Sequence, residues 1–251
     1  MLIFLSSVFF SGIFLNIGIV PPVMKTPYGF VMILAPIPDT PREIPLYRET
    51  LRDGDQISLY LKNFTPPGQP LVSAEEAPAL AQPIIDKNGG FPSDAGSPFA
   101  YSMIGKTIDG DTGKVLEEDP ERTWVIYNRQ IGDLPVLSDE LIKVDFMANG
   151  AASLERKWRT LEKTGTNATF ITSRQALEKM SRGEVLNPPM CCLNAFLVKN
   201  ISLGYYDYRT SRTLNNPDIV EDPVVTLEPA WILGGSFPDG DPWDLHIDAR
   251  K

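Results

Sequence analysis

The longest apolar stretch of the chain lies at its start. Residues 1–20 read MLIFLSSVFFSGIFLNIGIV, with no charged residue and no proline. As a helix this segment would be about 30 Å long, which matches the hydrocarbon core of a bilayer. Pro21 and Pro22 would end the helix near the headgroups. The pattern predicts a transmembrane anchor over residues 1–24, while a signal peptide and a helix buried in a core stay open as alternatives.

Residues 25–69 follow with many prolines and mixed charge. The segment from Pro36 to Glu49 suits an extended stalk that leads away from a membrane. Residues 57–61 alternate between apolar and polar and predict a short strand.

Two later segments have the spacing of amphipathic helices. Ser73 and Glu76 form the pattern of a capping box, and apolar residues follow at helical spacing up to a glycine pair. Pro78 and Pro83 count against a regular helix there. Thr172 with a glutamine three residues later predicts a second capping box and a helix that ends at a glycine.

Strand patterns fill most of the remaining chain. Alternation, or β-branched and aromatic content, predicts strands over residues 100–108, 114–118, 123–128, 141–147, 196–208, 224–233 and 243–249. The Asp109–Gly113 segment predicts a turn, and Asn149-Gly150 is a strong hairpin signal. Residues 151–161 are ambiguous, because Leu154 and Trp158 suit a helix and also share a strand face.

A helix followed by strands therefore occurs twice. This order predicts an α+β fold, in which an N-terminal transmembrane anchor helix precedes two units, each with a helix packed on an antiparallel sheet. The predicted division is the anchor at 1–24, a proline-rich stalk with a short strand at 25–69, a first unit at 70–162 and a second unit at 163–251.

Several of these segments resemble a known family. The text SAEEAPALAQPIIDKNGGFPSDA followed by IDGDTGKVLEED resembles a PepSY-type unit, in which an alanine-rich helix precedes a hairpin with an Asp-x-x-Thr-Gly turn. The text YNRQIGDLPVLSDELIKVDFMANG, the helix at 172–183 and LEPAWIL are similar to membrane-tethered extracytoplasmic regulators of bacterial two-component kinases. Those regulators carry tandem PepSY-like folds behind one anchor helix. The resemblance implies a binding or inhibitory module outside the membrane, with no catalytic residue.

Composition and charge narrow the classes of partner. Hydrophobic content of 43% and charged content of 22% are ordinary for a globular protein. The net charge of −9 argues against a nucleic-acid partner, because no basic run offsets repulsion by phosphates. We expect no nucleic acid and no cofactor.

The two cysteines, Cys191 and Cys192, are adjacent. Neighbouring residues rarely reach disulfide geometry without strain, so we expect a buried apolar pair; a redox pair or a soft-metal site is the alternative.

Three sequons are candidate sites for N-linked glycans. They begin at Asn63, Asn167 and Asn200, and none has proline in the middle. All three fall in loops or on the polar side of a strand.

The single histidine, His246, alternates with Asp244 and Asp248 along a predicted strand. These side chains share one face and could meet Asp239 or Asp241 at a metal, but a solvated polar face is the simpler interpretation. The Asp109–Gly113 turn lacks the remaining ligands of a calcium loop. We therefore assign no metal ligand.

Catalytic patterns are weak. The chain has no glycine-rich phosphate loop and no nucleophile elbow, and a dyad of Cys191 or Cys192 with His246 lacks an orienting third group. The tryptophans fit best in the core; they are Trp124, Trp158, Trp231 and Trp243.

We expect a single-pass protein of the cell membrane with an extracytoplasmic C-terminal domain. It would be a non-catalytic protein-binding or regulatory module that contacts a protein partner at the membrane surface through exposed strand edges. A structural subunit of a cell-surface or membrane assembly is the alternative, and a hydrolase is a weaker hypothesis.

Overall fold

The computed structural model describes residues 22–39, 43–66, 69–110, 112–188, 193–208, 224–238, 240 and 242–251. Within these ranges the chain forms fourteen strands and two short helices. The predicted α+β class, with two helix-on-sheet units behind an anchor helix, is therefore wrong: the protein is mostly β. Strand pairing between residues far apart in the sequence, which local patterns do not reveal, accounts for the difference.

The described chain divides into two compact units, and each draws on separated parts of the sequence. Unit 1 combines residues up to 42 with 170–202 and 230–251, and unit 2 combines residues 43–169 with 203–229. The predicted units at 70–162 and 163–251 are consecutive, whereas the observed units interleave. Strands β12 (Leu193–Tyr206) and β13 (Val224–Ser236) each contribute residues to both.

The predicted anchor helix at residues 1–24 is wrong at its C-terminal end, which is the part that the structure describes. Val23 and Met24 begin strand β1 (Val23–Thr26), which forms an antiparallel hairpin with β2 (Gly29–Ile33). In the part of the chain that the structure describes, no helix is both long and apolar enough to cross a membrane. Residues 1–21 lie outside the described residues, and nothing in the described part of the chain supports a single-pass anchor.

Residues 25–69 contain paired strands over much of their length. Besides β1 and β2, they include β3 (Ile44–Thr50), which pairs with β11 (Thr160–Ala168), and β4 (Gln56–Leu61), which pairs with β10 (Ala152–Lys157).

Unit 1 contains helix α3 (Ser173–Ser181) and several strands of the nine-stranded sheet. Strand β2 pairs in parallel with β12, and β14 (Pro242–Asp248) pairs antiparallel with β13. Helix α3 begins at the predicted capping box. The Thr172 hydroxyl accepts a hydrogen bond from the Gln175 N–H, and the Gln175 side-chain oxygen accepts one from the Thr172 N–H. The core of this unit is apolar and includes Val31, Leu177, Met180, Phe196, Trp231, Leu233 and Ile247.

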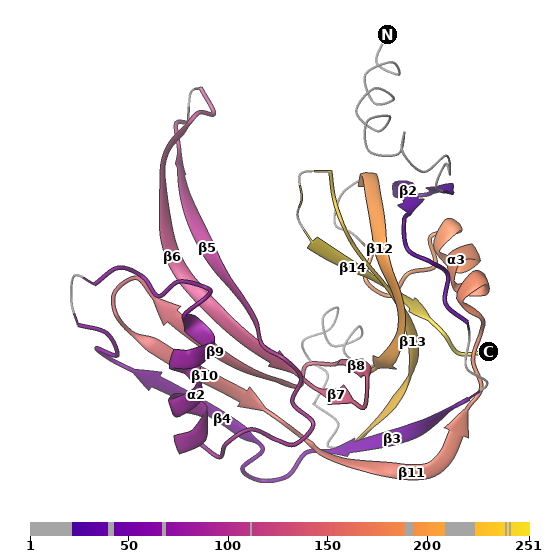
Figure 1. Ribbon diagram of the computed structural model, residues 1–251, viewed down its shortest axis with the longest axis horizontal. Helices are drawn as coiled ribbons and strands as arrows, with labels where there is room; N and C mark the ends of the chain where they lie inside the picture. The colour runs from indigo at the N-terminus through magenta and orange to yellow at the C-terminus, as the bar shows by residue number, and fades with distance from the viewer. Residues whose placement is uncertain are drawn as a thin grey trace. The chain divides into compact units, whose positions relative to one another are not determined.

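Unit 2 contains a five-stranded antiparallel sheet (Figure 1). The strand order is β4-β10-β9-β6-β5, where β9 is Leu141–Met147, β6 is Val115–Asn128 and β5 is Phe99–Ile108. Helix α2 (Ala77–Lys87) covers one face, and its alanines and isoleucines join a core with Val125, Val144, Phe146 and Leu154. Arg156 from β10 donates to the carbonyl oxygens of Asn88 and Gly90 at 3.2 and 3.1 Å, which caps the end of α2.

Unit 2 also contains a short hairpin outside its five-stranded sheet. Strands β7 (Gln130–Ile131) and β8 (Leu134–Leu137) pair antiparallel through a two-residue loop. Gly132 opens this loop with φ of +60°, a conformation that glycine adopts without strain. Strand β8 also pairs in parallel with the end of β12, and β3 pairs with the start of β13.

Candidate functional site

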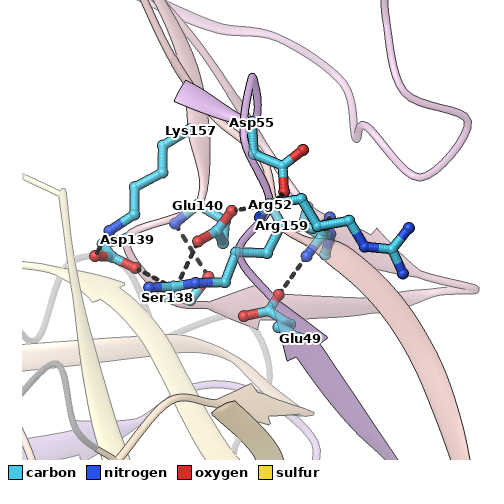
Figure 2. A network of polar contacts seen from close by, with 9 residues as sticks. Glu49, Arg52, Asp55, Ser138, Asp139, Glu140, Lys157 and Arg159 are labelled. Atoms are coloured by element: carbon cyan, nitrogen blue, oxygen red, sulfur yellow. Dashed lines mark hydrogen bonds and ion pairs between the residues drawn. The ribbon is translucent and has the colours of Figure 1, made fainter. Parts of the chain in front are cut away.

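Four charged side chains lie in the interior of unit 2. Glu49, Arg129, Glu140 and Arg159 are at most 2% exposed, although charged residues are rarely buried unless they are paired. Glu49 lies in β3, and the others lie where a strand begins or ends: Arg129 after β6, Glu140 before β9 and Arg159 after β10. The fold thus collects charges from sequence-distant strand ends at one place, part of which is drawn in Figure 2.

Arg129 is held by three contacts. Its Nη1 pairs with Glu49 Oε1, and its Nη2 donates to the carbonyl oxygen of Arg159. Its Nε lies 2.8 Å from Asp94 Oδ2 without the alignment of a hydrogen bond. The guanidinium also lies 4.9 Å from the centre of the Trp158 ring, within the range of a cation–π contact.

Arg159 and Glu140 form the second pair of this network. Arg159 Nη1 donates to Glu140 Oε1 at 2.7 Å, and the Arg159 backbone N–H donates to Glu140 Oε2 at 2.5 Å. Asp139 lies 3.4 Å from Arg159 Nη1 and pairs with Lys157 at the more exposed end, as Figure 2 shows. The two pairs form one network, because Arg129 donates to the backbone of Arg159.

Burial shifts the titration of both glutamates. It raises the pKa of Glu49 to about 7, against the lowering effect of Arg129. Burial likewise raises the pKa of Glu140, against the lowering by the Arg159 hydrogen bond and charge. Glu49 Oε2 has no hydrogen-bond partner among the described residues. Glu49 therefore changes charge near neutral pH.

A cleft of about 380 Å³ borders this network. The residues that line it are Ser93, Asp94, Ala95, Gln130, Ile131, Gly132 and Leu161. Asp94 connects the cleft to the buried charges, because its Oδ1 accepts a 3.0 Å hydrogen bond from Trp158 Nε1 and its Oδ2 faces Arg129. Its side chain keeps 25% of its surface exposed. The cleft thus combines one oriented carboxylate with apolar walls.

Strand β5 presents a second candidate surface. Among the strands that the structure describes it pairs only with β6, which leaves its other edge open over ten residues. The β5–β6 hairpin continues beyond β9, whose pairing with β6 ends at Arg122 (Figure 1). Its exposed apolar side chains are Phe99, Met103, Ile104, Ile108, Val115 and Leu116.

One face of this hairpin carries a row of aromatic rings. Tyr101 lies opposite Trp124 with ring centres 5.3 Å apart and planes at 82°, and Phe99 follows at 5.2 Å from Tyr101. Lys143 Nζ lies 5.0 Å from the centre of the Trp124 ring. The buried neighbour Val125 points to the α2 side, so the aromatic row lies on the opposite face.

His246, for which the sequence predicts a solvated polar face and not a metal site, lies in unit 1. Burial lowers the pKa of His246 to about 4, so the side chain is neutral at pH 7. Its backbone N–H donates to Asn187 Oδ1 at 2.7 Å. No group of three or more potential metal ligands occurs in the described ranges, and Asp239 and Asp241 lie outside them.

The three sequon asparagines are all exposed. Asn63 lies in the turn after β4 with φ of +54°, Asn167 lies in β11 and Asn200 lies in β12. Each position therefore leaves room for a glycan, and occupancy stays a prediction. Cys191 and Cys192 lie outside the described residues.

The structure tests the predicted turn and the predicted core positions of the tryptophans. Asp109 accepts hydrogen bonds from the Thr112 and Gly113 N–H groups in the β5–β6 turn, which confirms the hairpin interpretation. Trp158 and Trp231 are buried as predicted, whereas Trp243 is 40% exposed and is not a core residue.

The sequence analysis did not identify the buried ion pairs. Glu49 falls in the predicted stalk, and the sequence analysis assigns no role to Arg129, since a charged residue is usually exposed. The sequence gives no clear signal, because Glu49, Glu140 and Arg159 each lie beside or near other charged residues, as surface charges commonly do. Only the spatial pairing of strand ends brings them together.

Comparisons with known proteins give no family. No family model matches the chain, and a comparison with curated proteins found no match. Among solved structures, the chain is similar to an uncharacterized protein from Eubacterium rectale, with 11% identity and a TM-score of 0.37. The match covers 75% of this chain and 57% of that one. At this level the likeness carries no argument, and the comparisons do not support the PepSY resemblance.

Proposed function

We propose that this protein is a non-catalytic protein-binding module, which takes up an extended segment of a partner at the open edge of β5. The observation that carries this proposal is the ten-residue edge itself, because an unpaired strand offers a row of N–H and C=O groups to an incoming chain. Many peptide-binding domains use such strand addition.

The composition of the two hairpin strands favours β5 over β6 as the binding edge. The free part of β6 carries a run of acidic residues and Pro120, features that oppose strand pairing. Strand β5 carries one charged residue, Lys106, which pairs with Glu118 across the hairpin at 3.1 Å. An incoming strand therefore meets few charges on β5.

The side chains beside this edge define the partner's pattern. On one face the row from Phe99 to Trp124 offers aromatic surface, and on the other face Ile104 and Ile108 are exposed. Since alternate residues of a strand point to opposite faces, we expect a partner segment with apolar side chains at alternate positions.

A charge placed in the edge tests the proposal. The full chain and its Ile104→Lys variant are each produced in the kind of cell that expresses the protein natively and are then purified. The proteins bound to each are quantified by mass spectrometry. We expect the partner to fall by about tenfold or more, because lysine in an edge strand opposes pairing. Tyr60→Lys is the matched control, since Tyr60 is 52% exposed on β4, the other edge of the same sheet. Equal recovery of every bound protein from both variants would reject the β5 edge.

A further inference from the structure

The cleft in unit 2 is separate from the β5 edge and has its own chemistry. Its lining residues come from the loop before β5, from the β7–β8 hairpin and from the start of β11. We propose that this cleft binds a primary ammonium group carried on an aliphatic chain, with Asp94 as the residue that contacts the charge.

The charge of the cleft favours a cation over an anion. Asp94 is the charged residue among those that line the cleft, and Arg129 lies behind it at 1% side-chain exposure. All three nitrogens of Arg129 already face acceptors: Glu49, the Arg159 carbonyl and Asp94 itself. An anion entering the cleft would thus meet a carboxylate and no positively charged lining residue.

The orientation of Asp94 favours an ammonium over a guanidinium. Its two oxygens are engaged by Trp158 and Arg129, at 3.0 and 2.8 Å, so the carboxylate does not offer two free parallel sites. A guanidinium binds best to such a parallel pair, whereas an ammonium is a point charge that needs one free lone pair.

The walls of the cleft fit the rest of this ligand. Ile131, Leu161 and Ala95 are apolar and suit a chain of methylene groups, while Gln130 and Ser93 add neutral polar groups. Small-molecule sites commonly combine apolar walls with few oriented polar groups. A volume of about 380 Å³ accommodates a lysine side chain or a small aliphatic amine.

Binding is tested by titrating the ¹⁵N-labelled full chain with Nα-acetyl-lysine N-methylamide. The control probe is Nα-acetyl-norleucine N-methylamide, which lacks only the ammonium group. We expect the lysine probe to shift the amide signals of Gln130 and Gly132 and to bind about tenfold more tightly, since a hydrogen bond to a charged group contributes about this factor or more. Equal affinity for both probes, or shifts elsewhere in the chain, would overturn the proposal.

Further comparisons identify the kind of molecule that carries the ammonium group and the residue that binds it. Tighter binding of the lysine probe than of n-butylamine assigns the site to a protein side chain, and the reverse assigns it to a free amine. Tighter binding of Nα-acetyl-arginine N-methylamide would overturn the choice of an ammonium.

Asp94→Asn should weaken binding of the lysine probe by about tenfold. The control Asp133→Asn should leave the affinity for this probe within about twofold, because Asp133 is exposed in the β7–β8 loop and does not line the cleft. Unchanged affinity in Asp94→Asn would reject the assignment; if that variant does not fold, the comparison of the lysine and norleucine probes decides.

Discussion

Glu49 and Arg129 form an ion pair in which neither side chain is more than 1% exposed. The two residues are 80 positions apart in the sequence: Glu49 lies in β3, and Arg129 lies between β6 and β7. A charge buried this deeply is costly unless its partner is present, because the interior cannot replace the water that it lost. The pair therefore links the stability of β3 to that of the segment after β6.

Arg129→Met should destabilise unit 2 by about 3–5 kcal/mol, because it leaves Glu49 without its partner in the interior. Urea unfolding followed by tryptophan fluorescence measures this change. Arg52→Met is the control: Arg52 pairs with Glu162 at 3.3 Å, but both side chains are 58% exposed. It should cost less than about 1 kcal/mol. Equal costs for the two variants would contradict a special role of the buried pair.

Glu49→Leu combined with Arg129→Met should be more stable than Arg129→Met alone. Removal of both charges leaves no uncompensated charge in the interior, and replacing such pairs by apolar residues is often neutral or better. A double-mutant cycle on the free energy of unfolding measures the coupling, which we expect to be about 1–3 kcal/mol. Additive effects of the two substitutions would show that the residues do not act as a pair.

The raised pKa of Glu49 should make the protein less stable as the pH rises. The group has a pKa of about 7 in the folded protein and an ordinary value of 4.5. Folding therefore favours the protonated form, so this contribution is fully present below pH 4.5 and is lost as the pH approaches 7. The loss is on the order of 3 kcal/mol.

Glu49→Gln isolates this contribution, because glutamine keeps the shape and does not titrate. Glu140 shifts in the same direction and is present in both proteins, so burial of Glu140 affects both in the same way. We expect the difference in unfolding free energy between the wild type and Glu49→Gln to change between pH 4.5 and 7 and to be flat above that range. A difference independent of pH would contradict the shift.

Thr172→Ala should weaken helix α3 by about 1 kcal/mol, because the Gln175 N–H loses its acceptor. Hydrogen exchange of the first amides of α3 measures the effect within unit 1. Thr172→Ser keeps the hydroxyl and should retain most of the protection. Loss of protection in Thr172→Ser as severe as in Thr172→Ala would contradict the role of the capping bond.

Local signals in the sequence predicted local structure well. Asn149-Gly150 joins β9 to β10, Asp109 organises the turn between β5 and β6, and Thr172 begins α3. Each of these features depends on residues within about four positions of one another, so a short window contains the whole cause. The ambiguous segment at 151–161 forms β10 and the start of β11, a choice made by its pairing with β9 and β4.

The class of fold and the candidate site depended on distant contacts. The predicted stalk contains β3, whose partners lie more than a hundred residues later in β11 and β13. Glu49 and Arg159 read as surface charges until these strands bring them together. The apolar pattern of the predicted helices was correct, but two short helices do not define an α+β protein when the remaining segments pair as strands.

The central claim, strand addition at β5, is tested most directly by photo-cross-linking in cells that express the protein natively. A photoreactive residue is placed at Ser102 or at Ile104, which lie two positions apart on one face of the edge strand, and at Tyr60 on β4 as the control. The account predicts that the first two positions cross-link to one partner, at sites two residues apart in its sequence, and that Tyr60 does not. Cross-links at unrelated sites, or the same products from Tyr60, would contradict strand addition at this edge.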